Sequence, residues 1–326
     1  MKQTAARLTL AFLTIAVPAT AALAQQGSYP NRPVTWVLGS GAGGVVDNSA
    51  RFVAKVLSEK VGQPIVIENK PGAGGIVGAE AVAQAKPDGY TMLYASQSQM
   101  ATFPHLYKKL SYKPLESFVA VNGMGDSSLL LVVNANSPYK TLEEFVEHLK
   151  KNPGKVNFGS AGAGTSPHLL MEMLQMATGT SAVHVPYKVP SNLHADLLSG
   201  TIDAIFDFSV VMRPQIDAGK LRALAISRGD RLKTFPTVPT FKERGLDIEL
   251  TAWASIAMPA GTPPDVVKRM SSALGETMKD PAVIKYFEDN DFGNLGHLDS
   301  EKLRAFYISE SEKFKKVVEK ANVTLD

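Results

Sequence analysis

The chain contains no cysteine and only two tryptophans among its 326 residues. Without cysteine, it has neither a disulfide framework nor a thiolate metal site. It has no H-E-x-x-H motif, and its six histidines are scattered, so we predict no metal site. Beyond residues 1–24, no apolar run is long enough to span a bilayer. These absences favour a protein whose stability comes from ordinary hydrophobic cores.

An excess of charge of one sign is also missing. Lys and Arg total 34, Asp and Glu total 31, and the formal net charge is +3. A nucleic-acid-binding protein needs a concentrated basic face. The lysines between residues 313 and 320 alternate with glutamates, which is typical of a solvated helix face. We therefore predict no nucleic-acid partner.

The first 24 residues have the pattern of a signal peptide. Lys2 and Arg7 precede a mostly apolar run, Leu8–Leu23, and Ala22-Leu23-Ala24 is a small-x-small cleavage site. The alternative is an N-terminal membrane anchor, but the run is short and Pro18 interrupts it. We predict cleavage before Gln25 and export to the periplasm.

Short apolar runs alternate with amphipathic stretches along the rest of the chain. This alternation predicts an α/β fold, in which mostly parallel sheets are flanked by helices. The predicted strands are Val34–Leu38, Ile65–Glu68, Thr91–Ala95, Val119–Gly123, Leu129–Val133, Val156–Phe158, Ala182–Val185, Ala204–Phe208, Ala223–Ser227 and Ala252–Met258. The predicted helices are Val46–Lys60, Ile76–Ala85, Leu142–Lys151, Leu169–Thr178, Leu193–Ser199, Pro214–Ala218, Pro264–Lys279 and Ser300–Ala321.

The order of these elements predicts two lobes. The tail after residue 258 is all helical, cannot form a sheet of its own, and should pack back on the first lobe. The chain would then cross between the lobes twice, near residues 126–130 and 248–254, which is the geometry of a hinge. The predicted division is residues 25–128 plus 252–326 for the first lobe and residues 129–251 for the second.

Two glycine-rich loops each follow a strand and open a helix. We call residues 39–44 (Gly-Ser-Gly-Ala-Gly-Gly) the first loop and residues 160–165 (Ser-Ala-Gly-Ala-Gly-Thr) the second loop. Glycine allows the backbone to approach a ligand closely, and a helix start offers unpaired N–H groups and a partial positive charge. Each loop is therefore a candidate anion site, and the pair suggests a small anion held from both sides.

The first loop also fits a dinucleotide fingerprint. It matches G-x-G-x-x-G, and Glu68 ends the next strand. Against this, Asp47 in the first helical turn would repel a pyrophosphate, and export leads to a compartment poor in free nicotinamide cofactors. We expect Asp47 to act as a helix N-cap with Arg51 one turn on. A secreted oxidoreductase remains one alternative.

An esterase is the other enzymatic alternative. Gly125-Asp126-Ser127-Ser128 faintly resembles a motif of secreted esterases, but it lies at the proposed hinge. No serine lies in a G-x-S-x-G nucleophile elbow.

Other polar residues lie near the predicted strand ends. Asn69–Gly75 is a third glycine turn, whose glycines either permit packing against the first loop or contact ligand. His168 follows Pro167 at a helix start, where a structural role is favoured over catalysis. Asp207 ends an apolar strand and can serve either as a ligand contact or as a turn residue.

Read in order, these segments resemble the periplasmic solute-binding proteins of tripartite tricarboxylate transporters, including the citrate-binding protein and the Bordetella uptake-gene (Bug) receptors. The resemblance covers nearly the whole mature chain. The motifs that carry it are Tyr29-Pro30, Ala42-Gly43-Gly44 with Asp47 and Arg51, Gly62-Gln63-Pro64, Val66–Gly75, Pro87–Thr91, Gly159–Thr165 with His168, Pro186-Tyr187-Lys188, Gly219–Ala225, Pro236–Thr240 and Pro259–Pro263.

The resemblance implies a two-lobe Venus-flytrap fold that closes on a small organic carboxylate and delivers it to a membrane permease. It implies a monomeric binding protein that is not an enzyme and has no catalytic residue and no cofactor. In that family, the first and second loops contact ligand carboxylates, partly through ordered water. The predicted ligand-binding residues are Gly39, Ser40, Gly41, Ala42, Gly43, Gly44, Asp47, Ser96, Ser160, Ala163, Gly164, Thr165, His168, Tyr187 and Asp207.

The sequence departs from the family pattern at two places. The family usually has Pro-Phe where this chain has Gly39 and Ser40, and Thr where it has Val46. The usual glycine after Lys188 is Val189. Loss of the aromatic side chain predicts more room and an added hydroxyl, so we hypothesise a bulkier ligand, such as a phthalate isomer.

Overall fold

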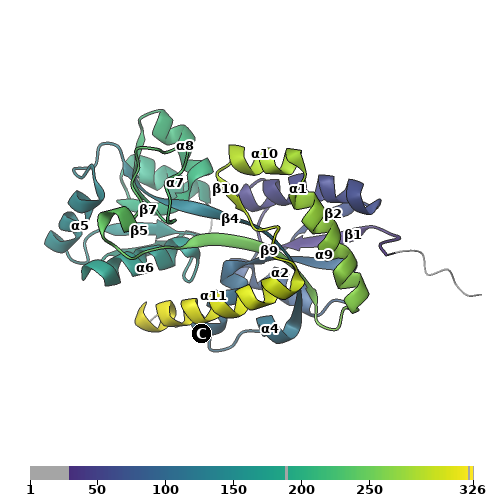
Figure 1. The fold of residues 1–326 in the computed structure, drawn as a ribbon. Coiled ribbons are helices and arrows are strands. Elements are labelled where there is room, and N and C mark those ends of the chain that lie inside the picture. Colours follow the sequence, from purple (N-terminus) through teal and green to yellow (C-terminus); the bar gives the residue numbers. More distant parts are fainter. Residues whose placement is uncertain (1–28, 188–189, 322–323, 326) are drawn as a thin grey trace, which may run out of the picture.

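Two groups of helices and strands lie side by side and are joined by two long strands, β4 and β9 (Figure 1). The computed structural model describes residues 29–187, 190–321 and 324–325. The predicted signal peptide, its cleavage before Gln25, and Lys188 and Val189 lie outside the described residues. Among the described helices, none is long and apolar enough to cross a membrane.

The first lobe is built on parallel strands. Its N-terminal elements are β1 (Val34–Leu38), α1 (Val45–Val61), β2 (Ile65–Asn69), η1 (Ala73–Gly75), α2 (Ile76–Ala83), β3 (Thr91–Ser96), the π-helical turn η2 (Ser98–Thr102), α3 (Phe103–Leu106) and α4 (Pro114–Ser117). β1 pairs in parallel with both β2 and β3. The loops after β1 and β3 therefore emerge at the same edge of the sheet.

Helix α1 shows how the sequence specifies these elements. Ala50, Val53, Ala54 and Leu57 recur every three to four residues and are buried, so one face of the helix packs on the sheet. The helix ends at Gly62, which has a left-handed φ of 71° and can adopt it because glycine lacks a Cβ.

Strands β4 (Phe118–Asn134) and β9 (Thr251–Pro259) connect the lobes. They pair antiparallel, from Phe118 with Pro259 to Ser128 with Thr251. From Leu129 onward, β4 pairs instead with β7 and β8. The predicted lobe boundaries at residues 128/129 and 251/252 stay a prediction, and they fall where β4 changes partners.

The second lobe repeats the strand–helix alternation. Its elements are α5 (Leu142–Lys151), β5 (Asn157–Ser160), α6 (Ser166–Thr178), β6 (Val183–Pro186), α7 (Pro190–Ser199), β7 (Ala204–Phe208), α8 (Ser209–Asp217), β8 (Leu221–Ile226) and η3 (Lys242–Arg244). β5 is parallel to β6 and β7. The full strand order is β2-β1-β3-β9-β4-β7-β5-β6, with β8 and β10 also paired to β4.

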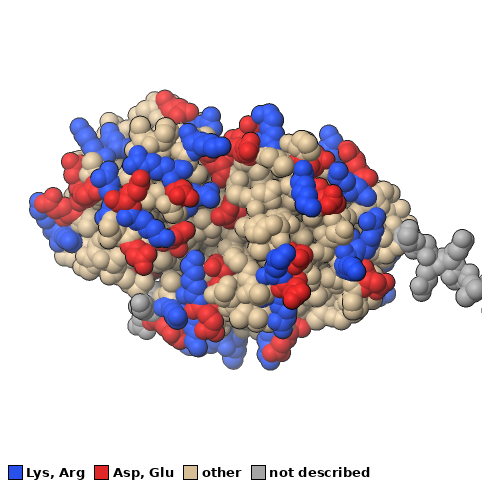
Figure 2. Space-filling model, viewed as in Figure 1, with Lys and Arg blue, Asp and Glu red and all other residues tan. Residues whose placement is uncertain are grey.

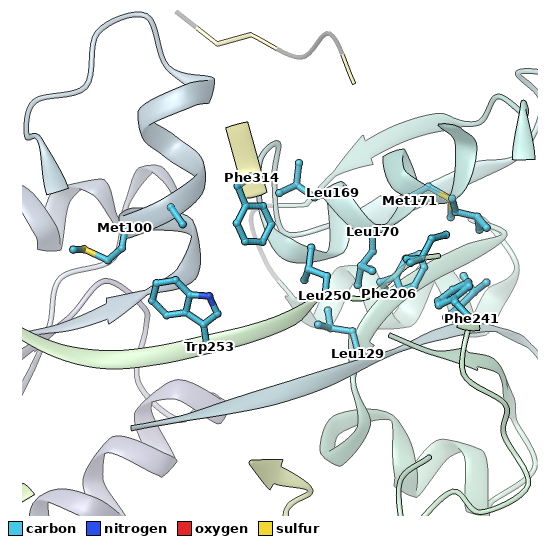
Figure 3. Close-up of a cluster of buried hydrophobic side chains, with 14 of the residues drawn as sticks. Met100, Leu129, Leu169, Leu170, Met171, Phe206, Phe241, Leu250, Trp253 and Phe314 are labelled. Atoms are coloured by element: carbon cyan, nitrogen blue, oxygen red, sulfur yellow. The ribbon is translucent and has the colours of Figure 1, made fainter. Parts of the chain in front are cut away.

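The C-terminal elements are α9 (Pro264–Met278), α10 (Pro281–Asp289), β10 (Phe292–Asn294) and α11 (Ser300–Ala321). The tail packs on the first lobe as predicted, where the Tyr307 hydroxyl lies 2.7 Å from Ser255 Oγ of β9. Helix α11 also reaches the second lobe, because Phe314 lies in the same buried cluster as Leu169 and Leu170 of α6 (Figure 3). One hydrophobic core therefore runs past the crossing strands.

Three expectations need correction. The strands predicted at residues 119–123 and 129–133 form the single strand β4. The sheets were predicted to be mostly parallel, but among the described strands only β1 with β2 and β3, and β5 with β6 and β7, pair in parallel, and every pair that involves β4 or β9 is antiparallel. The helix predicted from Pro214 begins at Ser209, with Pro214 inside it. Helix α10 and the π-helical turn η2 were not predicted.

Candidate functional site

The first loop is open to solvent at the N-terminus of α1. Residues 41–44 are exposed. Among the described residues, no partner is found for the N–H groups of Gly41, Ala42 and Gly44. Gly44 is the N-cap of the 17-residue helix α1, so these amides add to the free N–H groups of its first turn. The loop therefore presents main-chain donors, without a protein partner among the described residues, at a positive helix end.

A buried carboxylate holds the first loop in place. Asp47 is 2% exposed and accepts hydrogen bonds from the Gly43 N–H, Arg51 Nε and Asn69 Nδ2, each at 2.9 Å. The hydrogen bond from Arg51 is the main cause that lowers the pKa of Asp47 to about 2, and the bonds from Gly43 and Asn69 add to it. Its negative charge is thus paired within the protein.

The expected pairing of Asp47 with Arg51 is confirmed, but its expected role as N-cap is wrong. Gly44 occupies the N-cap, and Asp47 lies in the first turn, where its side chain turns back to the loop. Asn69 completes the arrangement by donating 3.1 Å to the Ser40 carbonyl oxygen.

The third glycine turn packs against the first loop, which is one of the two roles expected of its glycines. A Cβ built on Gly39 would lie 2.6 Å from the Cα of Gly75. Gln99 of η2 fixes the turn by donating to the Gly75 carbonyl oxygen at 2.8 Å. Its Oε1 accepts from the backbone and hydroxyl of Ser96, at 2.9 and 3.0 Å. The Ser96 hydroxyl therefore orients Gln99, which in turn holds the third glycine turn against the first loop.

The second loop is more buried than the first. Ser160 is 0% exposed, and its Oγ accepts from the Gly162 N–H at 3.0 Å. The Thr165 hydroxyl donates to the Gly162 carbonyl oxygen at 2.7 Å. Among the described residues, the N–H groups of Ala161 and Ala163 have no partner, so they are the donors this loop can offer a ligand.

Two histidines pack beneath the second loop. The Gly164 N–H donates to His168 Nδ1 at 3.1 Å, and Ser160 Oγ lies 2.6 Å from His184 Nε2. The two ring centroids are 4.2 Å apart. Burial lowers the pKa of each ring to about 4, and His184 adds to the effect on His168. Both imidazoles are neutral at pH 7, and His168 has the structural role expected of it.

One short segment, residues 97–106, touches both loops. A Cβ on Gly39 would lie 3.0 Å from Gln99 Nε2, and one on Gly164 would overlap Leu106. Gln97, which is 1% exposed, accepts a 2.8 Å hydrogen bond from the hydroxyl of Ser166 at the start of α6. The structure therefore brings the first and second loops against the same segment of η2 and α3.

The last two predicted residues are Tyr187, which follows β6, and Asp207, which lies on β7. The Tyr187 hydroxyl donates to Asp196 Oδ2 at 2.6 Å, and Asp207 Oδ2 lies 2.6 Å from His194 Nε2. Asp207 also accepts from the Phe208 N–H at 2.7 Å, and it lies within β7, where it pairs with Leu130 of β4, rather than in a turn. Among the described residues, no group of three acidic or histidine side chains can hold a metal ion.

Sequence reasoning missed several supporting residues. Asn69, Gln97, Gln99 and His184 reach the loops only through strand pairing or the π-helical turn. The π turn itself is a known mark of functional sites, but it has no clear sequence pattern. Parallel pairing brings Asn69 beside Leu38, and His184 beside Phe158.

Comparison with known proteins identifies the class. The model of the tripartite tricarboxylate transporter family receptor matches residues 49–323. The chain also resembles the solved periplasmic binding protein BugD, with 32% identity, 91% of this chain and 99% of that chain covered, and a TM-score of 0.83. The chain therefore belongs to this receptor family and has its two-lobe solute-binding fold.

Two further solved structures carry ligands. One is the Rhodopseudomonas palustris protein Rpa4515 with adipate, at 26% identity and a TM-score of 0.85, covering 91% of this chain and 99% of that chain. The other is MatC from the same species with bound malate, at 28% identity and a TM-score of 0.81, covering 89% of this chain and 100% of that chain. Both ligands are dicarboxylates.

Proposed function

We propose that this protein is a periplasmic receptor that captures a small organic carboxylate between its first and second loops and delivers it to a membrane permease. Residues 1–24 would direct export and then be removed. The two lobes, residues 25–128 plus 252–326 and residues 129–251, would close about β4 and β9 because the ligand contacts both. The receptor acts as a monomer and carries out no reaction.

The observation that carries this proposal is the set of unpaired main-chain donors on the first loop. Gly41, Ala42 and Gly44 present N–H groups at the start of a long helix. The nearby cation, Arg51, is already paired with Asp47. A carboxylate held here would be bound by amide dipoles and by bridging water rather than by an ion pair.

Helix dipoles alone cannot supply the affinity. A micromolar dissociation constant corresponds to about 8 kcal/mol, whereas one helix end contributes about 0.3–1 kcal/mol, up to about 2 when partly buried. Hydrogen bonds to a charged group contribute about 1.5–3 kcal/mol each. Two loops with several amides each, plus burial of the apolar part of the ligand, can reach the required total.

The residues at the front of the first loop bear on which carboxylate is bound. The space beside Gly39 is occupied by Gly75 and Gln99, so added room would have to come from position 40. There the Ser40 hydroxyl is buried and, among the described residues, lacks a hydrogen-bond partner. We propose a ligand bulkier than malate, with an aromatic dicarboxylate such as a phthalate isomer as the first choice.

Isothermal titration calorimetry on the mature chain tests the function. The panel is adipate, malate, the three phthalate isomers, their dimethyl esters and NAD. We expect at least one dicarboxylate to bind and to raise the melting temperature, and the esters and NAD to do neither. At 100 times the dissociation constant, a ligand stabilises the native state by about 2.7 kcal/mol. Binding of NAD without any carboxylate, or turnover of the esters, would support an enzyme instead.

A further inference from the structure

The side chain of His184 lies directly behind the second loop. It is carried by β6, which pairs with β5 so that His184 lies beside Phe158, while Ser160 ends β5. This register brings His184 Nε2 to 2.6 Å from Ser160 Oγ. His184 is outside the set of ligand-binding residues predicted from the sequence.

The Ser160 hydroxyl links His184 to the backbone of the second loop. Its Oγ accepts the Gly162 N–H at 3.0 Å and lies 3.1 Å from the Gly162 carbonyl oxygen. Gly162 has a φ of +134°, a conformation that only glycine adopts readily. Fixing both polar groups of Gly162 orients the flanking peptides, so that the N–H groups of Ala161 and Ala163 stay free of internal partners among the described residues.

The imidazole is itself held on both sides. Its centroid lies 4.9 Å from that of Phe158, with a nearly parallel ring, and 4.2 Å from that of His168. His168 in turn accepts the Gly164 N–H at 3.1 Å. A ring stacked in this way cannot swing away from Ser160 without disturbing the packing under the whole loop.

We infer that His184 is a positioning residue for carboxylate binding. Through its hydrogen bond with Ser160, it holds the second loop in the shape that presents the Ala161 and Ala163 amides to the ligand. It does not touch the ligand itself. This inference rests on the proposed function, because it assigns His184 to the same site.

The test compares two substitutions of the same ring. His184→Phe keeps the stacking with Phe158 but cannot hydrogen-bond to Ser160, whereas His184→Gln keeps a group that can. We measure the dissociation constant of the best dicarboxylate of the panel by calorimetry, and the melting temperature of each protein without ligand. His297, which is exposed, provides the matched controls His297→Phe and His297→Gln.

We expect His184→Phe to weaken binding at least tenfold, His184→Gln to restore it to within about threefold of wild type, and both controls to bind like wild type. In a double-mutant cycle, Ser160→Ala should weaken binding to the same extent as His184→Phe, and the double variant should be no weaker than either single one. If His184→Phe fails to fold, His184→Leu, which also lacks a hydrogen-bonding group, takes its place in the comparison with His184→Gln.

Wild-type affinity in His184→Phe or in Ser160→Ala would overturn the inference, as would equal losses in the Phe and Gln variants. These results are distinct from a failure of the proposed function, in which the wild-type chain itself would bind no member of the dicarboxylate panel.

Discussion

The two glycine-rich loops occupy equivalent places in their lobes, but they are supported by different chemistry. The first loop is exposed and is anchored by the charged pair of Asp47 and Arg51 together with Asn69. The second loop is buried at Ser160 and Gly164 and is anchored by the neutral rings of His168 and His184. The same task, holding main-chain amides in place, is therefore solved once with an ion pair and once with uncharged imidazoles.

This difference follows from burial. An ion pair is tolerated under the first loop because Arg51 is half exposed and stays hydrated, with 49% of its side chain accessible. Under the second loop, a charged imidazole would have to be desolvated, which burial of the rings opposes. Among the described residues, neither anchor leaves a free cation at its loop. The visible face of the molecule likewise carries mixed charges (Figure 2).

The largest expected effect is on the pH dependence of stability, which should differ between the supports of the two loops. The pKa of each histidine is about 4 in the folded chain, below its ordinary value of 6.5. The unfolded chain therefore binds more protons between these values, and stability falls as the pH drops from about 6.5 toward 4. At pH 5, each neutral imidazole should lower the free energy of unfolding by about 2 kcal/mol relative to its value at neutral pH. The contribution of Asp47, with a pKa of about 2, should persist until the pH falls below about 4.

Urea unfolding at pH 7 and pH 5 measures this effect. His168→Phe should reduce the loss of stability at pH 5 by about half relative to wild type, whereas His297→Phe should leave it unchanged. An equal pH dependence in wild type and His168→Phe would contradict the assignment of neutral rings.

Removal of the carboxylate under the first loop comes next. Asp47→Ala deletes three hydrogen bonds, one of them to a charged group, and should lower the free energy of unfolding by about 3 kcal/mol. It should also weaken carboxylate binding at least tenfold, because the Gly43 peptide loses its anchor. Asp289→Ala breaks an exposed ion pair of the same i,i+4 type, between Lys285 and Asp289, and should change stability by less than about 0.5 kcal/mol. Similar effects of the two changes would show that the first loop does not depend on Asp47.

The second loop should be sensitive to added volume at Gly164. Gly164 has a φ of +76°, and a Cβ there would overlap Leu106 of α3. Gly179 has a similar φ of +65° with no atom near a built Cβ. Gly179→Ala should therefore lower the free energy of unfolding by about 1 kcal/mol, from backbone strain alone. Gly164→Ala should lower it by about 2 kcal/mol more, because of the overlap. The double variant Gly164→Ala with Leu106→Ala relieves this overlap, so it should bind the dicarboxylate more tightly than Gly164→Ala alone. Equal free energies of unfolding for the two glycine variants would show that the overlap with Leu106 does not destabilise Gly164→Ala.

The smallest effect is expected at Ser40. Its buried hydroxyl has no partner among the described residues, so Ser40→Ala should change the stability of the free protein by less than about 1 kcal/mol. It should change the order of affinities within the carboxylate panel, which calorimetry can rank. An unchanged order would exclude Ser40 from ligand selection.

The comparison of the two loops also marks the limit of what the sequence reveals. Strand β1, helix α5 and both loops were placed correctly because apolar periodicity and glycine clusters are local features. The pairing of Asp47 with Arg51 was also predictable, from its i,i+4 spacing. The contacts of Asn69 and His184 depend on the register between parallel strands, which a local pattern does not specify.

Strand β4 shows the same limit. The sequence predicted two strands there, Val119–Gly123 and Leu129–Val133, yet both lie within one strand, with bulges in the pairing with β9. A Cβ on Gly125 would lie 2.6 Å from Phe287, and one on Gly123 would overlap the Leu295 backbone. These glycines admit the C-terminal segment against the crossing strand, a long-range requirement that was invisible from the neighbouring residues.

A crystal structure of the chain with its best dicarboxylate tests the central claim most directly. We predict that carboxylate oxygens lie within hydrogen-bond distance, directly or through one water, of the amides of residues 41–44 and of the Ala161 or Ala163 amide. A ligand bound away from these amides, or one that contacts a single loop, would contradict the account.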